Sequence, residues 1–212
     1  MPSKMFWSVS WKKLVSELLA QYSALMSFII ELWMPILVSA VFVFIVSSVL
    51  HTVLVAWHGS DCQGLKAEAD VMRALRDAGD EPGEYMMPYS ASMEEMKSPE
   101  YCAKMNEGPV GRVTIMAGNS FHMGSALVKW FGLSLAVSVM CAYVTTFASS
   151  SPDDYIQIFR LTGVTAFCAY SFGYIHNYVW AGTPAKVAIK FVVDGLLYSL
   201  VTAGTFGWLM AG

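Results

Sequence analysis

The chain has 212 residues, of which 56% are hydrophobic and only 14% are charged, and its formal net charge is −3. About a quarter of the residues in a soluble domain are charged, so this composition argues against a water-soluble globule. No basic patch is present that would bind nucleic acid. The charged residues gather at 61–112, and long stretches elsewhere hold none or one. Because helices that face lipid are apolar nearly all round, the sequence predicts an all-α membrane protein with one polar insert.

Residues 1–33 predict an amphipathic helical leader that lies at the membrane surface. Its apolar side chains recur every three or four positions, as on one face of a helix, at Trp11, Leu14, Leu18, Tyr22, Leu25 and Ile29. We expect the leader to run into the first span at Pro35, because proline is tolerated in the first turn of a helix. A fifth span would instead need a turn near Pro35, and no polar linker is present there.

Four segments are long and apolar enough to cross a bilayer, which requires about 20 apolar residues in a helix. The first lies within residues 34–58 and covers 35–57. The other three lie within residues 123–212, at 126–147, 156–178 and 189–210. The sequence therefore predicts a four-helix transmembrane bundle with the polar insert between spans 1 and 2.

The insert, residues 59–122, contains 11 acidic and 6 basic residues. It has few large apolar groups to bury by itself, so we expect it to pack on the membrane domain. Turn signals are present at Pro82-Gly83 and Met87-Pro88. The remaining pattern predicts a helix over 65–78 closed by Gly79, a helix beginning at Ser98-Pro99-Glu100 and broken by Gly108-Pro109, and an extended piece at 112–116.

Ionisable residues of the spans gather at the membrane boundary on the side of the insert. Such groups are costly in lipid, and they face the bundle interior or a watery cavity. Asp194 is the strongest candidate for a site, because a carboxylate cannot reach far toward water. Lys190, at i−4, would neutralise it locally, or Lys129 or His51 would do so across helices. The set forms either interface anchors or a polar ligand pocket: His51, His58, Lys129, His176, Lys190 and Asp194.

Histidine is the commonest metal ligand, and His51 and His58 are seven residues apart, hence on one face of a helix. A metal or haem site would use His51, His58 and His176. However, the sequence contains no HxxxH, CxxCH or CxxC motif. We therefore expect no cofactor, with metal or haem binding as an alternative.

The orientation of the insert follows from the basic residues near the span ends. More of them lie on the side of the insert than on the opposite side, and the positive-inside rule then places the insert in the cytoplasm. Cys62 and Cys102 of the insert would form a disulfide only in an oxidising compartment.

Small residues recur every fourth position along the last span, at Gly195, Ser199, Ala203 and Gly207. Such stripes let helix backbones approach closely in a membrane. The stripe serves either helix packing within one subunit or contact in a homo-oligomer or larger complex.

Two stretches resemble a group of small bacterial membrane proteins without a settled activity. The first runs from Met96-Lys97-Ser98-Pro99-Glu100 through Gly108-Pro109-Val110-Gly111 to His122-Met123-Gly124. The second runs from Asp194-Gly195-Leu196 through Thr205-Phe206-Gly207-Trp208. The resemblance covers about residues 34–210 and leaves the leader outside. It implies four spans in a bacterial inner membrane, and it supplies no catalytic residue.

The leading functional hypothesis is a non-catalytic accessory or scaffold subunit of a membrane complex, bound to the lipid bilayer and to other membrane helices. The chain contains no Walker loop, nucleophile elbow, zinc-protease signature or dinucleotide fingerprint, so we do not expect an enzyme. Two alternatives remain: the metal- or haem-binding membrane protein, and a small oligomeric carrier or channel that uses Asp194 and Lys129.

Overall fold

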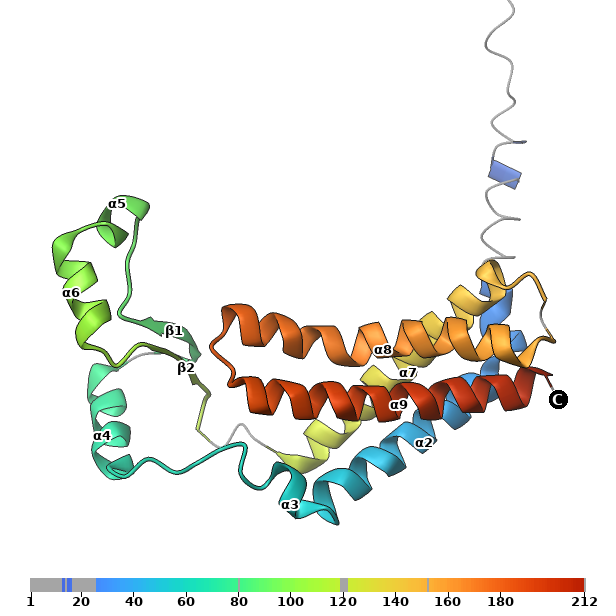
Figure 1. Cartoon of the computed structure of the whole chain (residues 1–212), viewed down its shortest axis with the longest axis horizontal. Coiled ribbons are helices and arrows are strands. Elements are labelled where there is room, and N and C mark those ends of the chain that lie inside the picture. Colours follow the sequence, from blue (N-terminus) through green and yellow to red (C-terminus); the bar gives the residue numbers. More distant parts are fainter. Residues whose placement is uncertain are drawn as a thin grey trace, which may run out of the picture. The chain divides into compact units, whose positions relative to one another are not determined.

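The computed structural model describes residues 13, 15–16, 26–79, 81–118, 122–151 and 153–211. The described chain is mostly helical, with one small sheet (Figure 1). Residues 26–31 are helical. Most of the leader predicted at 1–33 lies outside the described residues, and its amphipathic helix stays a prediction.

The described part of the chain contains four long helices: α2 (Trp33–Thr52), α7 (Met123–Ala148), α8 (Tyr155–Trp180) and α9 (Ala185–Ala211). Among the described residues, three of these, α2, α7 and α9, are long and apolar enough to cross a membrane. Helix α8 has 26 residues, as α7 does, but Gln157, Arg160 and His176 make it less apolar. The structure thus agrees with a membrane protein that has three candidate spans.

The first predicted span does not continue to Trp57 as one helix. Helix α2 ends at Thr52, and α3 (Val55–His58) follows after a short break. At the break the N–H of Leu54 donates to the carbonyl of Val49, at 3.1 Å, instead of to the residue four positions back. Beyond the break, the side chains of Trp57 and His58 form hydrogen bonds with Asp194 of α9.

The chain forms two compact units, and each of the four long helices contributes to both. The first unit consists of residues 1–47, 130–170 and 195–212. Hydroxyl groups link its helices: Ser39 Oγ of α2 lies 2.8 Å from Ser138 Oγ of α7. Trp130 Nε1 of α7 donates to Ser47 Oγ of α2 at 2.7 Å. In a membrane such bonds and close packing hold helices together, because lipid supplies no hydrophobic effect between them.

Small residues bring α8 and α9 close together within the first unit. A Cβ atom added at Gly163 of α8 would lie 3.4 Å from the Cβ of Ala203 of α9. One added at Gly207 would lie 2.6 Å from the ring of Tyr155. Ala203 and Ser199 of the predicted stripe are buried, so these members of the stripe pack within the subunit.

The second unit consists of residues 48–129 and 171–194 and contains the polar insert. The insert includes three short helices, α4 (Glu68–Ala78), α5 (Met93–Met96) and α6 (Pro99–Glu107). The predictions for α4 and α6 are confirmed. Gly79 ends α4 with a left-handed φ of 70°, and the Ser98 hydroxyl caps α6 by accepting from the Tyr101 N–H at 3.1 Å.

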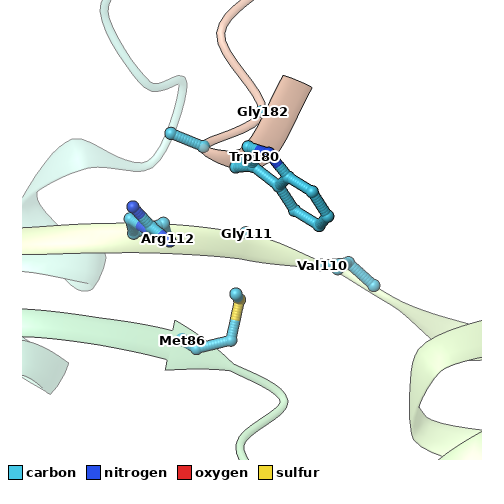
Figure 2. A pocket seen from close by; sticks show the side chains of 7 residues that line it. Met86, Val110, Gly111, Arg112, Trp180 and Gly182 are labelled. Atoms are coloured by element: carbon cyan, nitrogen blue, oxygen red, sulfur yellow. The ribbon is translucent and has the colours of Figure 1, made fainter. Parts of the chain in front are cut away.

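Strands β1 (Gly83–Met87) and β2 (Gly111–Ile115) form an antiparallel pair in which Gly83 faces Ile115 and Met87 faces Gly111. The extended piece predicted at 112–116 is therefore β2, whereas β1 was not predicted. The connection between α8 and α9 lies against this pair, with Trp180 over the strand at Gly111 and Met86 nearby (Figure 2). Between them is a cavity of about 210 Å³, lined by Met86, Val110, Gly111, Arg112, Trp180, Ala181 and Gly182.

Candidate functional site

A group of charged and polar residues in the second unit, which we name the Asp194 cluster, joins α9 to the segment that follows α2. Asp194 itself lies on α9 and is only 1% exposed. Its Oδ1 accepts a hydrogen bond from Trp57 Nε1 at 2.9 Å. Its Oδ2 lies 2.7 Å from His58 Nε2. Both oxygens of this buried carboxylate are thus paired, as the cost of burying a charge requires.

The cluster continues through His58 to a second carboxylate. His58 Nδ1 lies 2.6 Å from Asp61 Oδ2. The other oxygen of Asp61 accepts a hydrogen bond from Lys190 Nζ, which also donates to the backbone carbonyl of Trp57. The cluster therefore has five members: Trp57, His58, Asp61, Lys190 and Asp194.

The proton count of the cluster follows from its hydrogen bonds. A neutral imidazole has one donor and one acceptor nitrogen, but each nitrogen of His58 faces a carboxylate oxygen. Two ionised carboxylates are satisfied only when both nitrogens donate, that is, by an imidazolium. The two carboxylates, the imidazolium and the Lys190 ammonium then sum to zero charge. A neutral and fully hydrogen-bonded group is the form in which charges are tolerated at low dielectric.

Asp61 lies outside the long helices, and its hydrogen bonds decide its ionisation. Burial alone would raise the pKa of the Asp61 carboxyl. The hydrogen bonds and charges of Lys190 and His58 outweigh that effect and hold the pKa below its ordinary value. Asp61 is therefore an ionised member of the cluster at neutral pH.

Aromatic rings enclose one side of His58. The ring of His51, from the last turn of α2, stacks on that of His58 with centroids 4.4 Å apart and planes 25° apart. Phe191 of α9 lies 4.9 Å from His58 and stacks on Tyr174 at 4.2 Å. His51 is exposed, whereas Asp194 is buried. The site thus has a polar, buried end at Asp194 and an accessible end at His51.

The structure brings together four of the six predicted site residues: His51, His58, Lys190 and Asp194. The other two, Lys129 and His176, are exposed, and no interaction found in the described part of the chain connects them to the cluster. Lys190 does not neutralise Asp194 as predicted; it pairs with Asp61, and His58 pairs with Asp194. The lysine reaches Asp61 because the chain returns toward α9 after α3.

The group of possible metal ligands differs from the predicted one. His176 is not part of the group, and Asp194 is its third member. One ligand atom each from His51, His58 and Asp194 lie within 4.8 Å of one another. Without contact between Lys129 and Asp194 in the described residues, the carrier or channel hypothesis gains no support.

Sequence reasoning missed two members of the cluster, Trp57 and Asp61. Position 57 was predicted only as the end of the first span, and Asp61 was assigned to the insert. One signal was available: Asp61 follows His58 by three residues, a spacing at which side chains meet in a helical turn. The cysteines of the insert, Cys62 and Cys102, are exposed free thiols in this structure.

Comparison of the chain with known protein families, with curated proteins and with solved structures finds no match.

Proposed function

We propose that this protein is a four-span integral membrane protein that acts as a non-catalytic scaffold subunit of a membrane complex. In this proposal the Asp194 cluster holds the polar insert at the membrane boundary, and the insert binds the partner. The observation that carries the proposal is the apolar face of α4, on which Val71 and Met72 are exposed.

The length and the ends of α8 support a fourth span. At 1.5 Å per residue its 26 residues extend about 39 Å, more than the roughly 30 Å hydrocarbon core of a bilayer. Its last residue, Trp180, lies beside the β1–β2 pair of the insert. Helix α7 begins just after the insert and ends just before α8. A polypeptide that leaves the side of the insert along α7 and returns to it along α8 crosses the membrane twice.

The Asp194 cluster supports the idea that the insert has a defined position. Asp61 stands at the start of the insert, and its carboxylate connects both to Lys190 of α9 and, through His58, to Asp194. Removing one partner from a buried ion pair costs about 3–5 kcal/mol, so the chain resists separation of this segment from α9.

Helix α4 supplies the proposed docking face. Val71 and Met72 are 39% and 48% exposed, whereas Arg73 and Asp77 lie on the opposite, polar face. No residue of α4, α5 or α6 is buried, and all three helices lie wholly within the described chain. Exposed apolar faces of this kind outside a membrane mark protein interaction sites. The 11 acidic against 6 basic residues of the insert favour a partner that presents basic and apolar side chains.

The cellular location is part of the proposal. We place the protein in a bacterial inner membrane, as the resemblance of its sequence implies. The excess of basic residues near the span ends on the side of the insert directs the insert to the cytoplasm. The partner would then be another subunit of the same membrane or a cytoplasmic protein recruited to it.

Site-specific photocrosslinking in native membranes tests the docking face. A photoreactive benzoyl-phenylalanine placed at Met72 should give a crosslinked product, because this side chain lies at the interface with the partner. The same residue placed at Asp77 is the matched control, since it lies on the polar face of the same helix. Mass spectrometry of the product then identifies the partner segment.

A basic, amphipathic segment of a second protein crosslinked at position 72 but not at 77 would support the proposal. A product that contains only a second copy of this chain would contradict the scaffold role and show a homo-oligomer instead. A protein that remains a lone, uncrosslinked monomer in native membranes would count decisively against a scaffold role.

A further inference from the structure

We propose that His51, His58 and Asp194 form a binding site for a divalent first-row transition-metal cation. This inference does not depend on a protein partner. Two imidazoles and one carboxylate are a donor set that suits Zn²⁺, Fe²⁺, Co²⁺ and Ni²⁺, whereas Mg²⁺ and Ca²⁺ prefer oxygen ligands alone.

The ligand atoms are close to the spacing that such a cation requires. Zn²⁺ bonds to nitrogen and oxygen of about 2.0–2.2 Å place the ligands of a tetrahedral site roughly 3.4 Å apart. His58 Nε2 and Asp194 Oδ2 are 2.7 Å apart, so they must separate slightly. The whole set lies within 4.8 Å, so His51 must approach. Its exposed ring now stacks on His58 and has to turn so that a nitrogen points at the cation.

The surroundings of these ligands are those of a built metal site. A histidine that binds a metal usually donates its other ring N–H to a carboxylate, which orients the ring and makes it a stronger ligand. Asp61 stands in that position, 2.6 Å from His58 Nδ1. A metal-binding carboxylate is in turn usually hydrogen-bonded, and Trp57 Nε1 donates to the free oxygen of Asp194 at 2.9 Å. Both contacts leave His58 Nε2 and Asp194 Oδ2 pointing at each other.

The metal would lie between His58 Nε2 and Asp194 Oδ2, which now face each other at 2.7 Å. Three protein ligands leave a fourth position for water, which is the arrangement of an open site. The exposed side of His51 provides access to it. Lys190 remains on Asp61 and keeps that carboxylate directed at His58.

Isothermal titration of the full-length protein in detergent tests the site, with ZnCl₂ added after removal of bound metal by a chelator. We expect one equivalent of Zn²⁺ to bind and to raise the melting temperature. Co²⁺ at the same site should show the visible absorption bands of tetrahedral nitrogen and oxygen coordination. Mg²⁺ should not compete.

Variants identify the ligands. His51→Ala and Asp194→Asn should abolish binding, and Asp61→Asn should weaken it by about 10–100-fold. His51→Ala is the decisive variant, because this side chain is exposed and its ring contacts in the described chain are with His58 and Phe191, so the metal-free variant should still fold. His176→Ala is the matched control, an exposed histidine without a contact to the cluster in the described chain, and should bind Zn²⁺ as the wild type does. Absence of Zn²⁺ and Co²⁺ binding by the wild type, or binding retained by His51→Ala and Asp194→Asn, would overturn the proposal.

Discussion

Trp130 of α7 contacts residues of α2, α8 and α9 in the first unit. Its indole N–H donates to Ser47 Oγ of α2 at 2.7 Å, and its ring lies 6.1 Å and 5.7 Å from the rings of Tyr170 and Tyr198. Hydrogen bonds between membrane helices contribute about 0.6 kcal/mol on average and at most about 1.7. We expect Ser47→Ala and Trp130→Phe each to destabilise the protein, with a coupling free energy of about 0.6 kcal/mol in a double-mutant cycle.

Unfolding of the purified protein by SDS measures that coupling. Trp130→Phe keeps an aromatic ring against Tyr170 and Tyr198, so the cycle reports the hydrogen bond and not the packing. Trp208→Phe is the control, because Trp208 is 62% exposed, and its combination with Ser47→Ala should be additive. Additive effects of Ser47→Ala and Trp130→Phe would show that the indole hydrogen bond contributes nothing to stability.

Some residues of the site could be predicted one by one, because an ionisable side chain in a membrane-spanning segment costs free energy and therefore indicates a site. Asp194, Lys190 and His58 stand out in apolar surroundings, and the structure brings all three together. Their pairing was not predictable. Hydropathy gives the depth of a residue in a helix, but the partner of Asp194 depends on the break after Thr52, where the sequence has neither glycine nor proline. Asp61 enters the cluster only because of that break.

At the scale of elements, the close approach of α8 and α9 at Gly163 leads to a prediction about packing. A leucine at this position would push its side chain into Ala203, which is fully buried. Overpacking of this kind costs about 1–3 kcal/mol, so we expect Gly163→Leu to lower the stability of the purified protein by that amount. Thermal unfolding in detergent, followed by circular dichroism, measures the loss.

Gly173→Leu is the matched control for this substitution. Gly173 belongs to the same helix, and a Cβ atom added there would meet nothing within 4 Å. Both variants change the helix propensity equally, so the difference between them isolates the contact with α9. Equal stabilities of the two variants would mean that α8 does not pack on α9 at Gly163.

Local signals made the helices of the insert predictable, whereas its sheet was not. Gly79 and Ser98 mark the ends of α4 and α6 through conformations and hydrogen bonds that involve only neighbouring residues. Strand β1 pairs with β2, and two helices separate the strands in the sequence. A pairing between such distant segments cannot be recognised from the local sequence of either strand. Its ends, at Pro82-Gly83 and Met87-Pro88, indicated turns, which is why the strand between them was missed.

The number of membrane crossings belongs to the whole molecule and decides on which side each connection lies. Four crossings place the connection between α8 and α9 on the side of the insert, as its position beside β1 and β2 suggests. If α8 did not cross, that connection would instead share the side of the connection between α7 and α8. The lower apolarity of α8 is the reason that composition alone does not decide between the two arrangements.

Single-cysteine variants distinguish these arrangements in intact cells. In a chain whose other cysteines are replaced, the reporters are the native Cys62 of the insert, Ser151→Cys between α7 and α8, and Ala185→Cys at the start of α9, all three exposed positions. With four spans and a cytoplasmic insert, a membrane-impermeant maleimide should label only position 151, because the membrane shields the other two. After permeabilisation all three should react, which controls for thiol reactivity. Labelling of positions 151 and 185 together, with Cys62 protected, would instead establish three spans and leave α8 on one side of the membrane.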